Sequence, residues 1–201
     1  MASATVLVVC GPSGAGKSTV GRAVAAAAGC AFLDADDFHP PANIAKMRAG
    51  TPLTDADRAP WLAALSAEVE RHVASGRKLV LACSALKAAH RRLLAGTPAS
   101  GSGAGACSSA EAAGGGADDE ACGRPSQPVA FALLLPPREA LARRLAARQA
   151  GGGHFMPAAL LDSQLAALEA GPPSGWLLVV ADERPPGDAA AAVAHAWLGA
   201  G

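Results

Sequence analysis

The sequence predicts an α/β fold, in which a parallel sheet of five strands carries helices on both faces. Short apolar runs alternate along the chain with alanine-rich stretches of helical length, the pattern of a parallel sheet covered by helices. A glycine-rich segment follows the first apolar run directly, as it does where a strand leads through a tight loop into a helix. The 201 residues suffice for one such domain and are too few for two, so we expect a single domain over residues 1–201.

The predicted strands are the short apolar runs, at residues 6–10, 31–33, 78–83, 129–135 and 176–181. The predicted helices are the alanine-rich stretches between and after them, at 17–28, 42–49, 58–74, 86–95, 137–149, 157–169 and 187–198. The helix at 58–74 has a clear apolar face, because its leucines and valines recur at spacings of three and four. Pro60 suits the first turn of this helix, where a proline removes no hydrogen bond.

One stretch, residues 96–128, does not fit this plan. It consists almost entirely of glycine, alanine, serine, proline and acidic residues, with no large apolar side chain to bury. Such a composition cannot offset the entropy that is lost on ordering, so we expect a disordered surface insertion. Cys107 and Cys122 lie within it. They are either two free thiols or joined by a disulfide, and the sequence leaves both alternatives open.

Charge and composition exclude several classes of partner. The 17 basic and 17 acidic residues give a formal net charge of zero, which argues against a nucleic-acid or membrane surface. No apolar run approaches the roughly 20 residues that span a bilayer, and no leader precedes the first strand, so we expect a cytoplasmic protein. Cys10, Cys30 and Cys83 lack the spacing of a metal site and are expected to be reduced core residues.

Residues 11–19 match the phosphate-binding loop pattern G-x-x-x-x-G-K-[ST] between a predicted strand and a predicted helix. The glycines allow positive φ and a close approach of backbone N–H groups to phosphate oxygens. Lys17 is expected to reach the β- and γ-phosphates of ATP, and Ser18 to bind Mg²⁺. An ordinary glycine-rich turn would leave the charge of Lys17 without a counterion. The predicted nucleotide-binding residues are Gly11, Pro12, Ser13, Gly14, Ala15, Gly16, Lys17, Ser18 and Thr19.

An acidic segment, Asp34-Ala-Asp-Asp-Phe-His-Pro40, follows the second predicted strand. Open α/β sheets bind their ligands at the carboxyl ends of the strands. In a small kinase one carboxylate there, Asp34, can help to hold hydrated Mg²⁺, and the next, Asp36, can accept the proton of the attacking hydroxyl. An acidic turn or helix cap is the alternative interpretation.

Further segments complete a set together with the phosphate loop and the acidic segment. They are Asn43-Ile-Ala-Lys-Met47, Gly50-Thr-Pro-Leu-Thr-Asp-Ala-Asp-Arg-Ala-Pro-Trp61, Ala82-Cys-Ser-Ala-Leu-Lys87 and Gly153-His-Phe-Met156. In this order and spacing the chain closely resembles the gluconokinase family, small P-loop kinases that phosphorylate D-gluconate at O6. The resemblance covers nearly the whole chain outside 96–128. It implies a P-loop kinase fold with a mobile lid, and a homodimer that converts ATP and D-gluconate to ADP and 6-phospho-D-gluconate for the pentose phosphate pathway.

The resemblance also implies roles for individual residues. Asp36 and His39 are expected to contact the polyol, with Asp36 orienting or deprotonating the attacking hydroxyl. Arg58 resembles a clamp for the gluconate carboxylate, because a guanidinium can engage an acid bidentately. The other predicted substrate contacts are Lys46, Ser84, Lys87 and His154.

Two arginines, Arg144 and Arg148, lie four residues apart and share one face of a predicted helix. We expect both to stabilise the transferring phosphoryl group as part of the lid, although a solvated charged face that includes Arg143 is the alternative. The family usually has R-x-G-H-F here, whereas Gln-Ala-Gly-Gly-Gly separates Arg148 from His154 in this chain. The segment from Gln164 to Glu169 keeps the terminal residues of the usual Q-F-E-T-L-E.

Three other functions compete with this interpretation. A shikimate-kinase-like enzyme would share the phosphate loop and the D-x-D pattern, but it should have a glycine-rich turn where this chain has Cys83-Ser-Ala-Leu-Lys87. A nucleoside-monophosphate kinase would need a base-recognition pocket for its acceptor. A module that senses ATP without catalysis would have no use for the acceptor base Asp36.

Overall fold

The computed structural model describes residues 4–96, 128–150, 158–169 and 176–199. Its centre is a five-stranded sheet in the order β2-β3-β1-β4-β5, in which every neighbouring pair is parallel. The strands are β1 (Val6–Cys10), β2 (Ala31–Asp34), β3 (Leu79–Ala82), β4 (Val129–Leu134) and β5 (Trp176–Val180). The five predicted strands are thus confirmed, each to within a residue or two at its ends.

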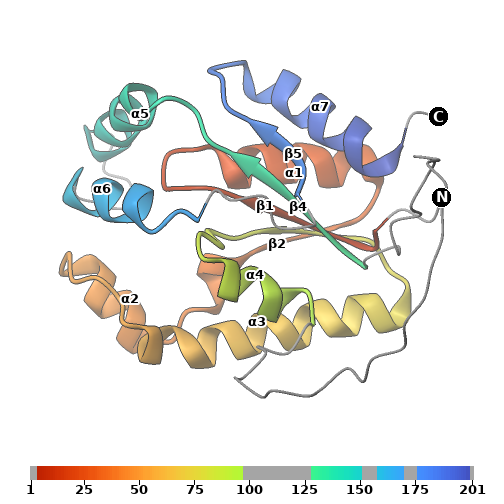
Figure 1. Cartoon of the computed structure of the whole chain (residues 1–201), viewed down its shortest axis with the longest axis horizontal. Coiled ribbons are helices and arrows are strands. Elements are labelled where there is room, and N and C mark those ends of the chain that lie inside the picture. The colour runs from red at the N-terminus through yellow and green to blue at the C-terminus, as the bar shows by residue number, and fades with distance from the viewer. Residues whose placement is uncertain (1–3, 97–127, 151–157, 170–175, 200–201) are drawn as a thin grey trace, which may run out of the picture.

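Helices cover both faces of the sheet, as predicted (Figure 1). Side chains alternate along β1, so Leu7 and Val9 join the core beneath α1 and α7, while Val6 and Val8 join the core beneath α3 and α4. Both faces of β1 are fully buried, which is typical of a parallel sheet between two helical layers. The helices are α1 (Lys17–Ala28), α2 (Pro41–Arg48), α3 (Asp55–Ser75), α4 (Ala88–Leu94), α5 (Arg138–Ala150), α6 (Ala158–Ala166) and α7 (Pro186–Leu198).

The start of α3 differs from the prediction. The helix begins at Asp55, three residues before the predicted start, because Thr54 and Asp57 form a capping box. Pro60 therefore lies inside the helix and not in its first turn, so its missing N–H removes one hydrogen bond of the ladder. The prediction for Pro60 was wrong because the apolar periodicity of α3 begins later than its cap.

Two predicted helices are shorter in the structure, and for the same reason. The carbonyl of Leu86 accepts hydrogen bonds from the guanidinium of Arg91 and from the N–H of Glu169. Leu86 and Lys87 consequently stay outside α4, and residues 167–169 stay outside α6. The acidic segment after β2 forms a single 3-10 turn, Ala35–Phe38. The carboxylate of Asp34 caps this turn by accepting the N–H of Asp36.

Several expectations fall outside the described residues: the disordered insertion over nearly all of 96–128, the state of Cys107 and Cys122, and the lid segment that carries His154. The other three cysteines are free thiols. Cys10 and Cys83 are buried, as predicted, whereas Cys30 is only partly buried against the core. Within the described ranges, no helix is long and apolar enough to cross a lipid bilayer.

Candidate active site

The phosphate loop connects β1 to α1, and its backbone requires glycine. Gly11, Gly14 and Gly16 all have positive φ, at 141°, 83° and 93°, a region that other residues rarely adopt. At Gly11 a side chain is excluded twice over, because a Cβ would lie 2.2 Å from the carbonyl oxygen of Leu134. The predicted positive φ of these three glycines is therefore confirmed.

The N-terminus of α1 faces the loop without a side-chain cap. Gly16 is the N-cap and offers no side-chain hydrogen bond, so the first-turn N–H groups are left for an anion. Lys17 reaches back across the loop, and its Nζ donates to the carbonyl of Pro12 over 3.0 Å. Burial lowers the pKa of Lys17, while the charges of Asp36 and Asp34 act in the opposite direction. A phosphate group placed here would compensate the charge of Lys17.

Ser18 and Asp34 lie together at the carboxyl end of the sheet. The hydroxyl of Ser18 donates to Asp34 Oδ2 over 2.6 Å, and the N–H of Asp36 donates to Asp34 Oδ1 over 3.2 Å. The described residues contain no cluster of three or more His, Cys, Asp or Glu that would form a complete metal cage. Mg²⁺ usually binds to one or two protein oxygens and otherwise to phosphates and water, so the hydroxyl and carboxylate of this pair fit that ion.

The acceptor side of the site begins at His39. Its ring stacks on Trp61 with a centroid distance of 4.4 Å and an interplanar angle of 13°, and Trp61 is itself fixed by a 2.7 Å hydrogen bond from Nε1 to the carbonyl of Ala35. Burial lowers the pKa of His39; the charge of Asp36 opposes this shift and that of Arg58 adds to it. The charges of Asp36 and Arg58 therefore both act on the ring of His39.

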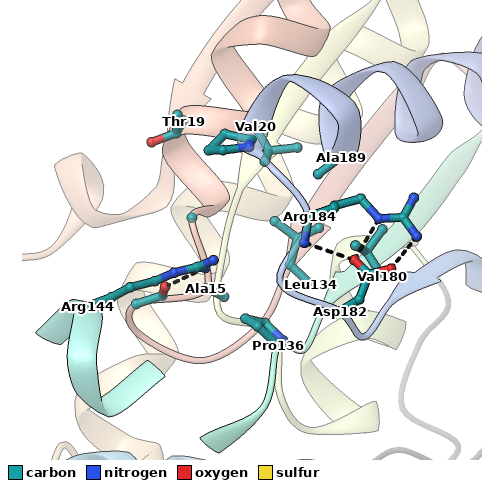
Figure 2. Close-up of a pocket in the computed structure, with 13 residues that line it drawn as sticks. Ala15, Thr19, Val20, Leu134, Pro136, Arg144, Val180, Asp182, Arg184 and Ala189 are labelled. Carbon is teal, nitrogen blue, oxygen red and sulfur yellow. Dashed lines mark hydrogen bonds and ion pairs between the residues drawn. The ribbon is translucent and has the colours of Figure 1, made fainter. Parts of the chain in front are cut away.

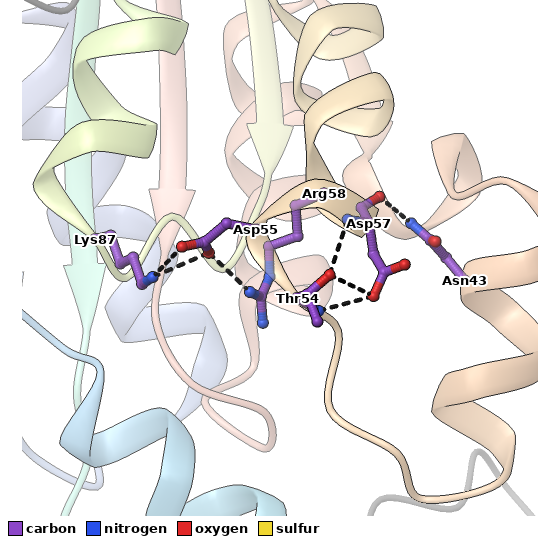
Figure 3. A network of polar contacts seen from close by, with 6 residues as sticks. All are labelled: Asn43, Thr54, Asp55, Asp57, Arg58 and Lys87. Atoms are coloured by element: carbon purple, nitrogen blue, oxygen red, sulfur yellow. Dashed lines mark hydrogen bonds and ion pairs between the residues drawn. The ribbon is translucent and has the colours of Figure 1, made fainter.

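Arg58 and Lys87 meet at one carboxylate, that of Asp55 (Figure 3). Lys87 Nζ lies 3.0 Å from both oxygens of Asp55, and Arg58 Nη1 lies 3.2 Å from Oδ1. The hydrogen bond from Lys87 lowers the pKa of Asp55. Two predicted substrate contacts from different elements, α3 and the β3–α4 connection, are thereby brought to the same point.

The other two predicted contacts of the acceptor side have different surroundings. Lys46 of α2 donates to Asp57 over 2.6 Å, and this bond, with those from Thr54, lowers the pKa of Asp57 to about 2. The carbonyl of Ser84 accepts the N–H of Gly11 over 3.3 Å, which joins the end of β3 to the phosphate loop.

The predicted donor-side arginines are not equivalent. Arg144 of α5 approaches the phosphate loop, with Nη1 3.4 Å from the carbonyl of Gly14. Arg148 is exposed at the end of the same helix and has no hydrogen bond or ion pair within the described part of the chain. Arg143 is exposed and pairs with Glu183 over 2.7 Å, and the alternative of a solvated charged face stays open for Arg148, which is exposed as well.

A cavity of about 190 Å³ opens beside the phosphate loop (Figure 2). One wall consists of the loop and the start of α1, and the opposite wall of the segment between β5 and α7. Arg184 lines that second wall and donates from Nε to Asp182 over 2.6 Å, an interaction that lowers the pKa of Asp182 to about 2. The cavity therefore continues directly from the loop and has room for a group attached to bound phosphates.

Comparison with known proteins identifies the family. A family model described as an AAA domain matches residues 6–170. The gluconokinase of Gluconobacter oxydans (strain 621H) is 42% identical over 163 residues, which cover 81% of this chain and 74% of that protein. The gluconokinase of Arabidopsis thaliana is 38% identical over 165 residues, which cover 82% and 78%. The chain belongs to the gluconokinase family.

A solved gluconokinase structure agrees with this assignment. The crystal structure of a gluconokinase from Sinorhizobium meliloti 1021 matches with a TM-score of 0.70 at 34% identity, covering 98% of this chain and 94% of that one. As a member of the gluconokinase family, the chain is a kinase that binds nucleotide, with the α/β P-loop kinase fold predicted from its sequence. Membership also sets aside the shikimate-kinase-like and nucleoside-monophosphate-kinase alternatives.

Some residues that shape the site in this gluconokinase-family chain were not predicted. Asp55 could have been suspected from its position three residues before Arg58, a spacing that favours an ion pair on a helix. For Gln164 and Glu169 the sequence offered only their match to the family pattern. In the structure Gln164 accepts the N–H of Ser13, and Glu169 accepts the N–H of Ala88. Arg91 gave no signal, because nothing local marks an arginine whose guanidinium is buried against carbonyls.

Proposed function

We propose that the chain catalyses the ATP-dependent phosphorylation of D-gluconate at O6, giving 6-phospho-D-gluconate and ADP for the pentose phosphate pathway. The observation that carries this proposal is the convergence of Arg58 and Lys87 on a single carboxylate, that of Asp55. Two cations at one point favour an acceptor that carries an acid group. The gluconokinases among its relatives support gluconate as that acceptor.

The donor half of the proposed reaction uses the phosphate loop. Its N–H groups and Lys17 would bind the β- and γ-phosphates, and the nucleoside would extend into the adjoining cavity of about 190 Å³. Ser18 and Asp34 would hold Mg²⁺, which when bound neutralises the charge that develops on the phosphate oxygens. Arg144 and Arg148 of α5 would add positive charge near the transferring phosphoryl group. Charged groups stabilise a transition state most effectively when they need no rearrangement during the reaction.

In the acceptor half, Arg58 and Lys87 would bind the carboxylate of gluconate, leaving the polyol to extend toward His39 and Asp36. Asp36 is exposed and its charge acts on Lys17, and its N–H bonds to the same carboxylate, Asp34, as Ser18. Its own carboxylate can therefore accept the proton of the O6 hydroxyl as the phosphoryl group arrives. The charge-assisted contacts at one end of the substrate would position the hydroxyl at the other end. Lys46, Ser84 and His154 remain proposed pocket members.

A coupled assay of ADP release tests the proposed function directly. The purified protein is given ATP and Mg²⁺ with either gluconate or shikimate at equal concentration, and turnover is expected with gluconate alone. Phosphorus NMR of the product tests the O6 position. Absence of gluconate-dependent ADP release would reject the proposal.

The domain organisation, oligomeric state and location of the protein are proposed from its sequence and its family. We infer a single kinase domain over residues 1–201 in which 96–128 is an insertion, and a homodimer in the cytoplasm without nucleic-acid or membrane partners. Light scattering coupled to gel filtration measures the oligomeric state, and a monomeric mass would contradict the dimer.

A further inference from the structure

We propose that Asp55 is an internal competitor for the carboxylate of the acceptor and so helps to set the affinity and selectivity of the site. This inference rests on the proposed function, because it takes Arg58 and Lys87 as the groups that bind that carboxylate. The inference adds an acidic residue to a site whose proposed carboxylate-binding residues are basic. The role of this residue is to compete with the substrate, whereas Arg58 and Lys87 bind the substrate and Asp36 accepts its proton.

The contacts of Asp55 are those expected of a bound acid group. Both of its oxygens accept from Lys87 Nζ at 3.0 Å, and Oδ1 also accepts from Arg58 Nη1 at 3.2 Å (Figure 3). The two cations come from elements far apart in sequence, α3 and the β3–α4 connection. A carboxylate from outside that takes these same hydrogen bonds from both cations displaces Asp55.

Asp55 is also easily displaced. Its side chain is 70% exposed, so water can solvate the carboxylate once it is released. It is the first residue of α3, where the helix dipole favours a negative charge whether or not the ion pairs form. The capping box depends on Thr54 and Asp57 and not on Asp55, so release leaves the helix start intact.

An incoming acid can make better contacts than Asp55 does. Arg58 gives Asp55 a single hydrogen bond from Nη1, whereas a free carboxylate can approach the guanidinium in a bidentate arrangement. The side chains of Arg58 and Lys87 are 30% and 35% exposed, so both are accessible from solvent. A neutral polyol offers no charge to replace that of Asp55, and the competition therefore favours sugar acids over sugar alcohols.

The substitution Asp55→Asn tests the inference, because it removes the charge and keeps the size. Exposed ion pairs are weak, so we expect the KM for gluconate to fall by roughly two- to fivefold. The change should appear in KM rather than in kcat, since Asp55 competes only with substrate binding, and the KM for ATP should stay unchanged. If Asp55 merely held the two cations in place, the KM for gluconate would rise, and a raised or unchanged KM overturns the inference.

The matched control is Asp162→Asn, on α6. Asp162 is also an exposed aspartate, at 58%, paired with an arginine, Arg138, and its substitution should leave the KM for gluconate unchanged. Melting temperatures of both variants report any loss of folded protein.

Calorimetric titration of gluconate without ATP separates this inference from the proposed function. A protein that binds gluconate but releases no ADP contradicts the proposed function, and tighter binding by Asp55→Asn than by wild type still supports the competition. Equal or weaker binding by the variant, or no binding by either protein, overturns it.

Discussion

Gln164 and Ser13 are joined by two hydrogen bonds, one in each direction. Oε1 of Gln164 accepts the N–H of Ser13 over 2.7 Å, and its Nε2 donates to the hydroxyl of Ser13 over 3.2 Å. Five residues later, Glu169 accepts the N–H of Ala88 at the start of α4 over 2.7 Å. The α6 segment is thus bonded both to the phosphate loop and to the connection that carries Lys87, so it links the nucleotide side of the site to the acceptor side.

Gln164→Ala is expected to weaken nucleotide binding. The loss of two neutral hydrogen bonds, each worth about 1 kcal/mol, loosens the phosphate loop and should raise the KM for ATP by roughly three- to tenfold. Ser163→Ala changes the exposed neighbour on the same helix and should have no effect. Equal values of the KM for ATP in the two variants would show that the Gln164 contacts do not support the loop.

Lys17→Ala is expected to abolish turnover while the protein stays folded. Lys17 lies across the phosphate loop, and its loss removes the charge expected at the β- and γ-phosphates. Arg144 approaches the loop from α5 at the carbonyl of Gly14 and does not occupy the position of Lys17. The coupled assay measures the rate, and circular dichroism checks the fold. A folded variant that keeps a tenth of the wild-type rate would contradict the role of Lys17.

Arg58→Ala is expected to raise the KM for gluconate far more than the KM for ATP. A charge-assisted pair with a carboxylate is worth roughly 1.5–3 kcal/mol, which corresponds to about a 10- to 100-fold change in KM. Arg71→Ala removes an exposed arginine from the other end of α3 and should change neither value. Equal effects of Arg58→Ala on both substrates would reject the carboxylate clamp.

The sheet and the phosphate loop could be predicted because their signals are local. The apolar run of β1 and the glycines that follow it lie within a dozen residues, and φ at Gly11 and Gly16 takes the sign that the pattern requires. Contacts between distant segments could not be predicted in this way. Gln164 and Ser13 are 151 residues apart, and neither residue type by itself indicates the other as a partner.

At the start of α3 two local signals in the sequence pointed to different residues. The signals for the capping box, Thr54 and Asp57, are present in the sequence, but the apolar face of the helix begins later and suggested a start at Arg58. Here the hydrogen bonds of the cap decide the boundary, at the expense of an internal proline. The capping residue Asp57 also accepts a hydrogen bond from Lys46. The resemblance to the family had suggested only a substrate contact for this lysine.

Arg91→Met is expected to destabilise the fold by about 2–3 kcal/mol, because hydrogen bonds from a charged group contribute more than neutral ones. Arg91 is only 3% exposed, and its guanidinium donates to the carbonyls of Ala85, Leu86 and Glu169. Among these, Ala85 has a φ of 39°, a conformation that alanine adopts only under constraint.

Urea unfolding measures the effect of this change. Methionine keeps an unbranched stem and lacks the donors, and Arg92→Met provides the control at the exposed neighbouring position. A loss of stability no greater than that of Arg92→Met would show that the guanidinium does not hold the β3–α4 connection.

Asp57 should make the stability of the fold depend on pH in the acid range. Its pKa is about 2 in the folded protein, below the value of about 3.9 for a free aspartate, so the folded state favours the ionised form. The stabilisation is therefore complete above pH about 4 and is lost as the pH falls through 2. We expect the difference in melting temperature between wild type and Asp57→Asn to be largest above pH 5 and to close toward pH 2.

Lys46→Met separates the two causes of this shift. The hydrogen bond from Lys46 is the largest contribution to the lowered pKa of Asp57, followed by those from Thr54. In a Lys46→Met background, the difference caused by Asp57→Asn should therefore be smaller and should close at a higher pH, nearer the value for a free aspartate. A difference that is independent of pH, or that grows as the pH falls, would mean that the ionised carboxylate of Asp57 does not stabilise the start of α3.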